Sequence, residues 1–450
     1  MVSMRNIFKI IIFVGLLFIT NPVYAKQTIA RIDIDGDLSN MVVKEDVRLV
    51  QISYKSEDMS FNSYATVNLQ GESSLKYPKK NYTLNLYYDK ELKKKRKFNL
   101  KWGNYDKYTL KANWLDQTHA RNIVGSDIAG DINEKYGYFK NTPNNGAIDG
   151  FPLEVYVNGV FHGLYTFNLH KDYMFDDGSG RDYILISTDG DFFFGYNNVV
   201  EDSNWSNFEV EVGEKNEETL AKLNRLLTFI NASSREEFTK NLENYFNLDS
   251  LLNYYCYIRY ADLIDNVSNN LFFLTYDGKI WYTVFYDLDI SYGYTWFGSN
   301  YVDDRRYYLQ STKLWRKLEW CYPDHIAVRY EELRKDIFTK DYINNKFYKF
   351  YNSIPNSSLT LEKQKWQEQK ESGNPTYEIE QVADFIDART PIIDKEIEKL
   401  KTDNYKKVYS EFSQDNDSID YKMSIYIMAV IFILIVSIVI FLKKIKMLKV

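Results

Sequence analysis

The sequence predicts an α+β protein with a β-rich N-terminal part and a mainly helical C-terminal part. Apolar and polar residues alternate through Ala30–Asp35 and Tyr64–Leu69, the period-two pattern typical of half-buried strands. From about Glu217 onward, most segments carry the spacing of amphipathic helices. The 450-residue chain is 45% hydrophobic and 17% aromatic, so it can bury a substantial core. General disorder is therefore excluded.

Short-range patterns predict the individual elements in order. Asn158-Gly159 is a pair that tight primed turns favour, so the strands on either side of it are expected to form a hairpin. Alternation predicts the strands, and apolar residues three or four apart predict the helices. The expected strands are Ala30–Asp35, Tyr64–Leu69, Tyr82–Tyr87, Leu153–Val157, Leu164–Phe167, Leu271–Thr275 and Ile280–Phe285; the expected helices are Arg121–Lys135, interrupted helices within Glu217–Tyr260, and most of the later chain to about Leu400.

The first residues have the features of a secretory signal. Arg5 and Lys9 are positive, Ile10–Ile19 is apolar, and Val23-Tyr24-Ala25 provides a small-x-small cleavage site. Cleavage there would start the mature chain near Lys26. The alternative is a retained anchor, although the apolar stretch is short for a membrane span.

A second apolar segment lies near the C-terminus. Ser424–Leu442 contains no charged residue, and its length as a helix, about 30 Å, matches the hydrocarbon thickness of a bilayer. Lysines follow at once, and the positive-inside rule keeps such a tail in the cytoplasm. The predicted protein is thus a single-pass protein of the cell membrane with an extracytoplasmic domain. Its predicted parts are a signal peptide (1–25), an N-terminal β segment (26–60), a main domain (61–400), a polar stalk (401–422), a transmembrane helix (423–442) and a basic cytoplasmic tail (443–450).

Composition excludes several classes of function. The formal net charge of −6 argues against a nucleic-acid partner. Cys256 and Cys321 are the only cysteines, too few for a disulfide framework, and Cys256 is expected to be a buried small hydrophobe. The four histidines show no metal-ligand spacing with the cysteines, which argues against zinc.

The densest set of chemically useful residues lies between Asp262 and Gly293. Asp265 and Asn270 have Asp-x4-Asn spacing between a predicted helix and a predicted strand pair. The second strand is expected to continue through Asp287 and Asp289, whose carboxylates would then share one face. Hard oxygen ligands of this kind suit Mg²⁺ or Mn²⁺. The order of these residues matches the needs of phosphoryl transfer, although each alone is equally consistent with helix capping or a turn.

A phosphate-binding segment is expected upstream. The backbone amides of Gly71–Ser74 have the character of an anion cradle, and Lys79 or Lys80 stands at the entrance of the next predicted strand. The alternative is an ordinary strand-ending turn. The sequence has no G-x-x-x-x-G-K-[ST] loop, so it is not a P-loop enzyme.

Four segments together resemble the CotH (spore-coat protein H) kinase family. They cover roughly residues 60 to 300 in the family's order, and the fourth is the most specific. They are NLQGESS at Asn68–Ser74 with PKKNY at Pro78–Tyr82, YTLKANW at Tyr108–Trp114 with Asp116 and Arg121-Asn122, EVYVNG at Glu154–Gly159 with GLY at Gly163–Tyr165, and NNLFF at Asn269–Phe273 leading to YDLD at Tyr286–Asp289 with Gly293.

This resemblance implies an atypical, two-lobed protein-kinase-like fold and metal-dependent phosphorylation of protein Ser or Thr. It implies that Asp265 orients the acceptor hydroxyl and that Asp287 binds the catalytic Mg²⁺ or Mn²⁺, although these two residues could exchange roles. Asn270 and Asp289 would assist with metal. The implied nucleotide-binding residues, with ATP as co-substrate, are Ser73, Ser74, Lys79, Lys80 and Arg121, the last being equally consistent with a structural salt bridge.

One departure from the family pattern weakens the case for activity. The family often has a Glu a few residues after the GLY hairpin, whereas Asn168–Asp172 contains none. Asp172 is a candidate substitute, and His170 is interpreted as a polar strand-end residue.

Three functions therefore stay open. The first is an extracytoplasmic kinase acting on exported or spore-coat proteins. The second is a catalytically silent kinase-like scaffold for cell-surface or spore-coat assembly. Glycan hydrolysis is weaker, because two carboxylates two residues apart are too close to flank a glycosidic bond.

Overall fold

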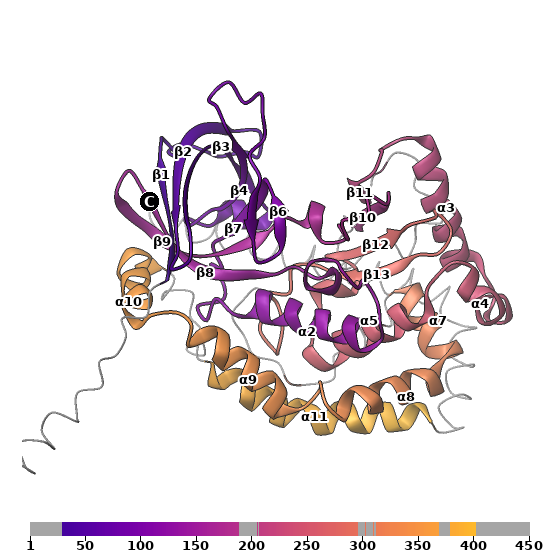
Figure 1. The fold of residues 1–450 in the computed structure, drawn as a ribbon. Helices are drawn as coiled ribbons and strands as arrows, with labels where there is room; N and C mark the ends of the chain where they lie inside the picture. The colour runs from indigo at the N-terminus through magenta and orange to yellow at the C-terminus, as the bar shows by residue number, and fades with distance from the viewer. Residues whose placement is uncertain are drawn as a thin grey trace, which may run out of the picture. The chain divides into compact units, whose positions relative to one another are not determined.

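The computed structural model describes residues 29–188, 205, 207–295, 302, 309, 312–368 and 379–401 (Figure 1). These described residues form two compact units. The first unit draws on residues 1–182, 285–301 and 339–385, and the second on residues 183–284, 302–338 and 386–450. Each unit is described by itself below.

The first unit is built on a closed β-barrel whose strand order is β1-β2-β3-β4-β7-β9-β8 (Figure 1). Neighbouring strands are antiparallel except β1 and β8, which close the barrel in parallel. The strands are β1 (Ala30–Asp35), β2 (Val47–Lys55), β3 (Ser60–Gln70), β4 (Asn81–Tyr87), β7 (Lys107–Lys111), β8 (Gly150–Val157) and β9 (Val160–Leu169); β5 (Phe98–Leu100) and β6 (Gly103–Tyr105) form a separate small sheet.

Alternation along the strands places one face of each inside the barrel. Ile32, Val67 and Leu84 are fully buried, and the rings of Tyr108 and Phe167 stack with centroids 4.8 Å apart. Each such aliphatic side chain contributes about 1.5–3 kcal/mol by leaving water. The barrel therefore contains a packed core.

Short helices complete the first unit. Helix α10 packs against β9, where Ile354 and Leu359 meet Leu164 in a small apolar cluster. Helix α9 packs against α2, and the Lys346 ammonium bridges Asp127 and Asp131 of α2. These helices are α2 (Arg121–Lys135), α9 (Lys340–Tyr351) and α10 (Asn356–Lys365), with one-turn 3-10 helices η1 (Ser73–Lys76), η2 (Pro143–Gly146) and η3 (Lys171–Tyr173).

The second unit combines a sheet of order β11-β10-β12-β13 with helices. Helix α5 is almost wholly buried, its Tyr254 ring stacks on Trp315 of α7 at 5.3 Å, and α8 packs along it. The strands are β10 (Ile184–Thr188), β11 (Phe208–Val212), β12 (Leu271–Thr275) and β13 (Tyr282–Phe285). The helices are α3 (Glu217–Ala232), α4 (Arg235–Asn241), η5 (Leu242–Asn244), α5 (Leu248–Ala261), η6 (Asp265–Val267), α7 (Lys313–Cys321) and α8 (Pro323–Arg334); α11 (Glu380–Leu400) contributes residues to both units.

Most sequence-based elements are confirmed. The strand-rich N-terminal and helical C-terminal parts are present, α2 has the predicted bounds, and Asn158 and Gly159 both have positive φ in the β8–β9 turn. Cys256 is buried and unbridged. Strands β1 and β2 of the barrel lie within the predicted N-terminal β segment (26–60), and the predicted domain boundaries stay a prediction. The two-lobed kinase-like fold stays a prediction.

The predicted signal peptide, transmembrane helix and cytoplasmic tail lie outside the described residues, as does the predicted stalk after residue 401. Among the helices that the structure does describe, none is both long and apolar enough to cross a membrane.

Candidate active site

An ion pair between Lys111 and Asp287 is the centre of the candidate site in the first unit. The Lys111 ammonium donates to both carboxylate oxygens of Asp287, at 2.9 and 2.7 Å. Lys111 is the last residue of β7, at the rim of the barrel, and Asp287 follows β13 by two residues. The two side chains are 12% and 22% exposed, so the pair is largely shielded but reachable from solvent.

The backbone around Asp287 corrects one prediction. Residues 286–289 were expected to continue the strand, but β13 ends at Phe285 and Asp287 has a left-handed φ of 52°. The backbone N–H of Leu288 donates to the Asn122 side-chain oxygen at 3.0 Å, and the Leu288 side chain is fully buried. Strand geometry is therefore not what groups Asp287 with Asp289.

The charges of both carboxylates, Asp287 and Asp289, act on one lysine, Lys111. Burial by itself would lower the pKa of Lys111, but the charges of Asp287 and Asp289 and the hydrogen bond to Asp287 outweigh burial and raise it. Lys111 is therefore an ammonium ion at neutral pH. Two carboxylates around one ammonium leave an excess of negative charge, and binding of a divalent cation there stays a prediction.

Side chains from several segments of the first unit hold this region. The Gln70 amide donates to the Tyr286 hydroxyl at 3.3 Å, and the Tyr294 hydroxyl donates to the Leu115 carbonyl at 2.6 Å. Non-glycine residues with left-handed φ also gather here, a costly conformation that often marks functional sites. They are Asn113, His119, Asp287 and Tyr292, with φ of 50°, 57°, 52° and 52°.

Arg121 is a buried structural hub. Its guanidinium pairs with Asp116 at 2.5 Å and donates to the Gln381 side-chain oxygen at 2.5 Å, while its backbone N–H donates to Asp116 at 2.8 Å. The Gln381 amide in turn donates to the Tyr292 carbonyl at 3.0 Å. Arg121 thus organises the turn before α2, consistent with the salt-bridge interpretation; a phosphate contact by it stays a prediction.

Lys79 lies in the interior. Its ammonium donates to the Ala112 and Leu164 carbonyls, at 2.8 and 2.5 Å, and to Glu362 of α10 at 2.5 Å. An ammonium has three N–H donors, so these partners saturate it. The other Glu362 oxygen accepts from the Leu164 N–H at 2.7 Å. A phosphate contact by Lys79 would require one of these bonds to break, and that role stays untested.

The segment before Lys79 forms a turn. Ser73 and Ser74 lie in η1, the Ser74 hydroxyl accepts from the Asn81 amide at 3.1 Å, and the Lys80 ammonium donates to the Leu75 carbonyl at 2.6 Å. These contacts match the strand-ending turn that the sequence left open, and phosphate binding by this segment stays a prediction.

Asp265 and Asn270 meet directly in the second unit. The Asn270 amide donates to Asp265 at 2.7 Å, and the Asn269 amide donates to the other carboxylate oxygen at 3.3 Å. Asn270 has a left-handed φ of 50°, and the buried Asn266 amide donates to its carbonyl at 3.3 Å. The loop therefore presents a fixed, half-buried carboxylate.

Asp172, the suggested replacement for the missing Glu, is already engaged. It pairs with Lys107 at 2.7 Å and with the His170 ring at 3.0 Å. Burial would raise the pKa of Asp172, but His170 and Lys107 together lower it well below its ordinary value. Glu362, on α10, also forms a carboxylate–lysine pair, with the buried Lys79.

Comparison with known proteins gives one result for this chain. The family model described as CotH kinase protein matches residues 67–393. This chain belongs to the CotH kinase protein family. A comparison with curated protein sequences gave no match. The matched range includes Lys79, Lys111, Asp265, Asp287 and Glu362, whereas β1 and β2 of the barrel precede it.

Metal binding by this CotH family member stays a prediction. None of the described residues form a group of three or more His, Cys, Asp or Glu side chains that could hold a metal ion. Mg²⁺ carried by a nucleotide needs only one or two protein carboxylates, because phosphates and water supply its remaining ligands. Asp287 and Asp289 provide that number.

Sequence reasoning missed Lys111 and Glu362. Lys111 is the middle residue of the YTLKANW motif, and a lysine at the end of a barrel strand, two residues before the left-handed Asn113, is a usable signal. Glu362 lies in an ordinary polar helix with no local signal, 283 positions from its partner Lys79.

Proposed function

We propose that the protein is an extracytoplasmic, membrane-anchored atypical kinase that transfers phosphate from ATP to Ser or Thr of exported or spore-coat proteins. The observation that carries this proposal is the Lys111–Asp287 pair with Asp289 beside it. Phosphoryl transfer needs a cation that holds phosphate oxygens and carboxylates that hold Mg²⁺ or Mn²⁺. Kinase activity is supported by membership in the CotH kinase family. The extracytoplasmic location and the membrane anchor are supported by the predicted signal peptide and the C-terminal apolar segment.

Each residue has a defined task in this proposal. Asp287 and Asp289 hold Mg²⁺ or Mn²⁺, which when bound would offset the charge of the phosphates. Lys111 turns from Asp287 to the phosphate oxygens when nucleotide enters, since its stem is long and its ammonium reachable. Asn122 keeps Asp287 in place through the Leu288 N–H.

The acceptor side of the reaction is assigned to Asp265. Its carboxylate would orient the Ser or Thr hydroxyl and receive its proton as the oxygen bonds to the γ-phosphorus of ATP, the bond from that phosphorus to the bridging oxygen breaks, and ADP leaves. The amides of Asn269 and Asn270 fix that carboxylate, which supports the assignment. Asn270 also keeps its predicted role of assisting with metal.

A catalytically silent scaffold is the second candidate. It is favoured by the absence of Glu from Asn168–Asp172 and by the engagement of Asp172 with Lys107.

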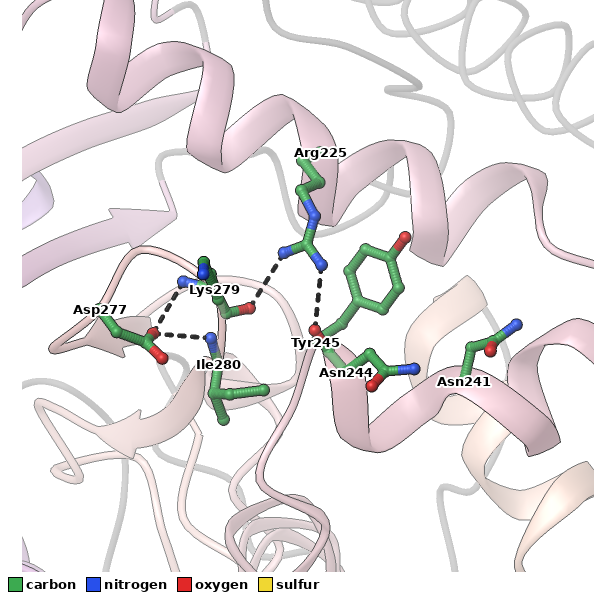
Figure 2. A pocket seen from close by; sticks show the side chains of 7 residues that line it. All are labelled: Arg225, Asn241, Asn244, Tyr245, Asp277, Lys279 and Ile280. Carbon is green, nitrogen blue, oxygen red and sulfur yellow. Dashed lines mark hydrogen bonds between the residues drawn. The ribbon is translucent and has the colours of Figure 1, made fainter.

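A transfer assay separates the two candidates. The full-length chain is incubated with γ-labelled ATP and Mg²⁺ or Mn²⁺, and label is followed on the protein itself and on Ser/Thr-rich test proteins. We expect metal-dependent transfer that Asp287→Asn abolishes and that Asp277→Asn, at an exposed turn of the second unit (Figure 2), leaves intact. Absence of transfer by a folded protein that binds no ATP would establish the scaffold instead.

A further inference from the structure

A strongly basic loop, residues 88–97, connects β4 to β5 in the first unit. It carries six positive and two negative side chains, in a chain whose formal net charge is −6. Residues 88–97 are called the basic loop below. Four of its lysines are exposed and have no ion-pair partner among the described residues: Lys90, Lys93, Lys94 and Lys97.

Hydrogen bonds hold the basic loop in a hairpin. The Tyr88 N–H donates to the Lys94 carbonyl at 3.0 Å, and the Arg96 N–H donates to the Leu86 carbonyl at 2.8 Å. The Lys95 ammonium pairs with the buried Asp106 carboxylate at 2.9 Å. The loop therefore presents its lysines from a fixed backbone, which lowers the entropic cost of binding a partner there.

The basic loop also exposes apolar side chains among its lysines. Tyr88 is 53% exposed and Leu92 is 37% exposed. Leu92 has a left-handed φ of 57°, a conformation that glycine or asparagine adopts at lower cost. An exposed leucine kept in such a conformation indicates a role in binding rather than in folding. Lysines mixed with exposed aromatic and aliphatic side chains are typical of segments that lie at a membrane–water interface.

The basic loop and Lys111 lie toward opposite ends of the barrel. At the beginning of β4, Tyr82 pairs with Leu110, the residue before Lys111. The basic loop begins where β4 ends, at Tyr87. Strand β4, from Asn81 to Tyr87, is about 20 Å long. A surface bound to the basic loop would therefore leave the Lys111 end accessible.

We propose that the basic loop docks on the anionic lipid headgroups of the membrane that anchors the chain. Each lysine near an anionic bilayer is attracted to it, and Tyr88 and Leu92 would enter the interface. Docking in this way turns the Lys111 end of the barrel away from the bilayer, toward exported proteins.

The predicted anchor favours a lipid surface as the partner. Residues 401–423, which at full extension span no more than about 80 Å, separate the end of α11 from the predicted membrane segment. This tether keeps the basic loop near the bilayer, so a weak electrostatic contact is sufficient for docking. The inference thus rests on the membrane anchor in the proposed function.

Hydrogen exchange of the full-length chain in lipid nanodiscs tests the docking. One set of nanodiscs contains phosphatidylcholine alone, and the other contains phosphatidylcholine mixed with phosphatidylglycerol. We expect peptides that cover the basic loop to exchange at least about tenfold more slowly in the anionic nanodiscs. The difference should disappear in about 1 M NaCl, where charges are screened within about 3 Å.

Two variants with equal changes of charge make the result specific. Replacement of Lys90, Lys93, Lys94 and Lys97 by Gln should abolish the slowing, because the basic loop then has no excess positive charge. The matched control replaces four exposed lysines elsewhere by Gln and should retain the slowing; these are Lys140, Lys240, Lys335 and Lys349.

Three outcomes would overturn the inference while leaving the anchor in place. They are equal exchange in neutral and anionic nanodiscs, slowing that persists after the four basic-loop substitutions, and slowing that occurs only when polyglutamate is added. The last result would assign the basic loop to an acidic protein partner. A chain that does not remain in nanodiscs of either composition would refute the membrane anchor itself, and the inference with it.

Discussion

Glu362→Gln tests the buried connection between α10 and the barrel. The Glu362 side chain is 4% exposed and that of Lys79 is fully buried, so solvent cannot compensate either charge. Glu362→Gln keeps the shape of the side chain and its hydrogen-bond acceptor, but it leaves the Lys79 ammonium among neutral partners. Removal of one member of a buried pair costs about 3–5 kcal/mol, and the retained acceptor places our expectation near about 3 kcal/mol. Such a loss is a large part of the about 5–15 kcal/mol that stabilises a typical domain.

A double-mutant cycle gives the cleanest measurement. Lys79→Met, Glu362→Gln and the double variant are unfolded in guanidinium chloride, and peptides of α10 and β9 are followed by hydrogen exchange. We expect the double variant to lose less stability than the sum of the losses in the two single variants. The difference, the coupling free energy, should be about 2–3 kcal/mol. Glu134→Gln, at an exposed position of α2, should shift stability by no more than about 0.5 kcal/mol. A coupling free energy near zero would refute the claim that the two charges depend on one another.

Three further predictions concern separate features of the first unit. Burial lowers the pKa of His119 to about 4, so the unfolded chain takes up this proton first as the pH falls. The free energy of unfolding should therefore fall by up to about 3 kcal/mol between about pH 6.5 and pH 4. The midpoint of thermal unfolding should depend less on pH over that range in His119→Gln. Gly71 has φ of 100°, and an added Cβ would lie 2.0 Å from the Ser74 hydroxyl, so Gly71→Ala should lower the free energy of unfolding by about 1–3 kcal/mol in denaturant titration. Asn122→Ala leaves the Leu288 N–H without its acceptor, so the initial rate of phosphate transfer should drop at least about tenfold, and an unchanged rate would show that Asn122 does not position Asp287.

Local chemistry explains which features the sequence could predict. The β8–β9 hairpin follows from Asn158-Gly159, because few residues tolerate positive φ at both turn positions. Helix α2 follows from its apolar spacing, and the Asp265–Asn270 contact is made within one short loop. In each case the determining contacts lie within a few residues of one another.

The missed features depend on distant partners. Lys111 meets Asp287 across 176 positions, and Lys79 meets Glu362 across 283. The left-handed conformation of Asp287 was missed because the YDLD pattern alternates like a strand, while the Asn122 contact that captures the next N–H comes from α2. Alternation of apolar and polar residues within single strands also does not predict that β1 and β8 pair and close the barrel.

Steady-state kinetics of Lys111→Met tests the central claim most directly, that Lys111 and Asp287 form the phosphate and metal site. Transfer of label from γ-labelled ATP is measured with the full-length chain at increasing ATP and fixed Mg²⁺, with Lys55→Met, at the exposed last residue of β2, as the matched control. Lys111→Met should raise the KM for ATP at least about tenfold and lower kcat, because a charge-assisted bond to phosphate is lost, while Lys55→Met keeps both values near those of the unmodified chain. Normal KM and kcat in Lys111→Met would contradict the account.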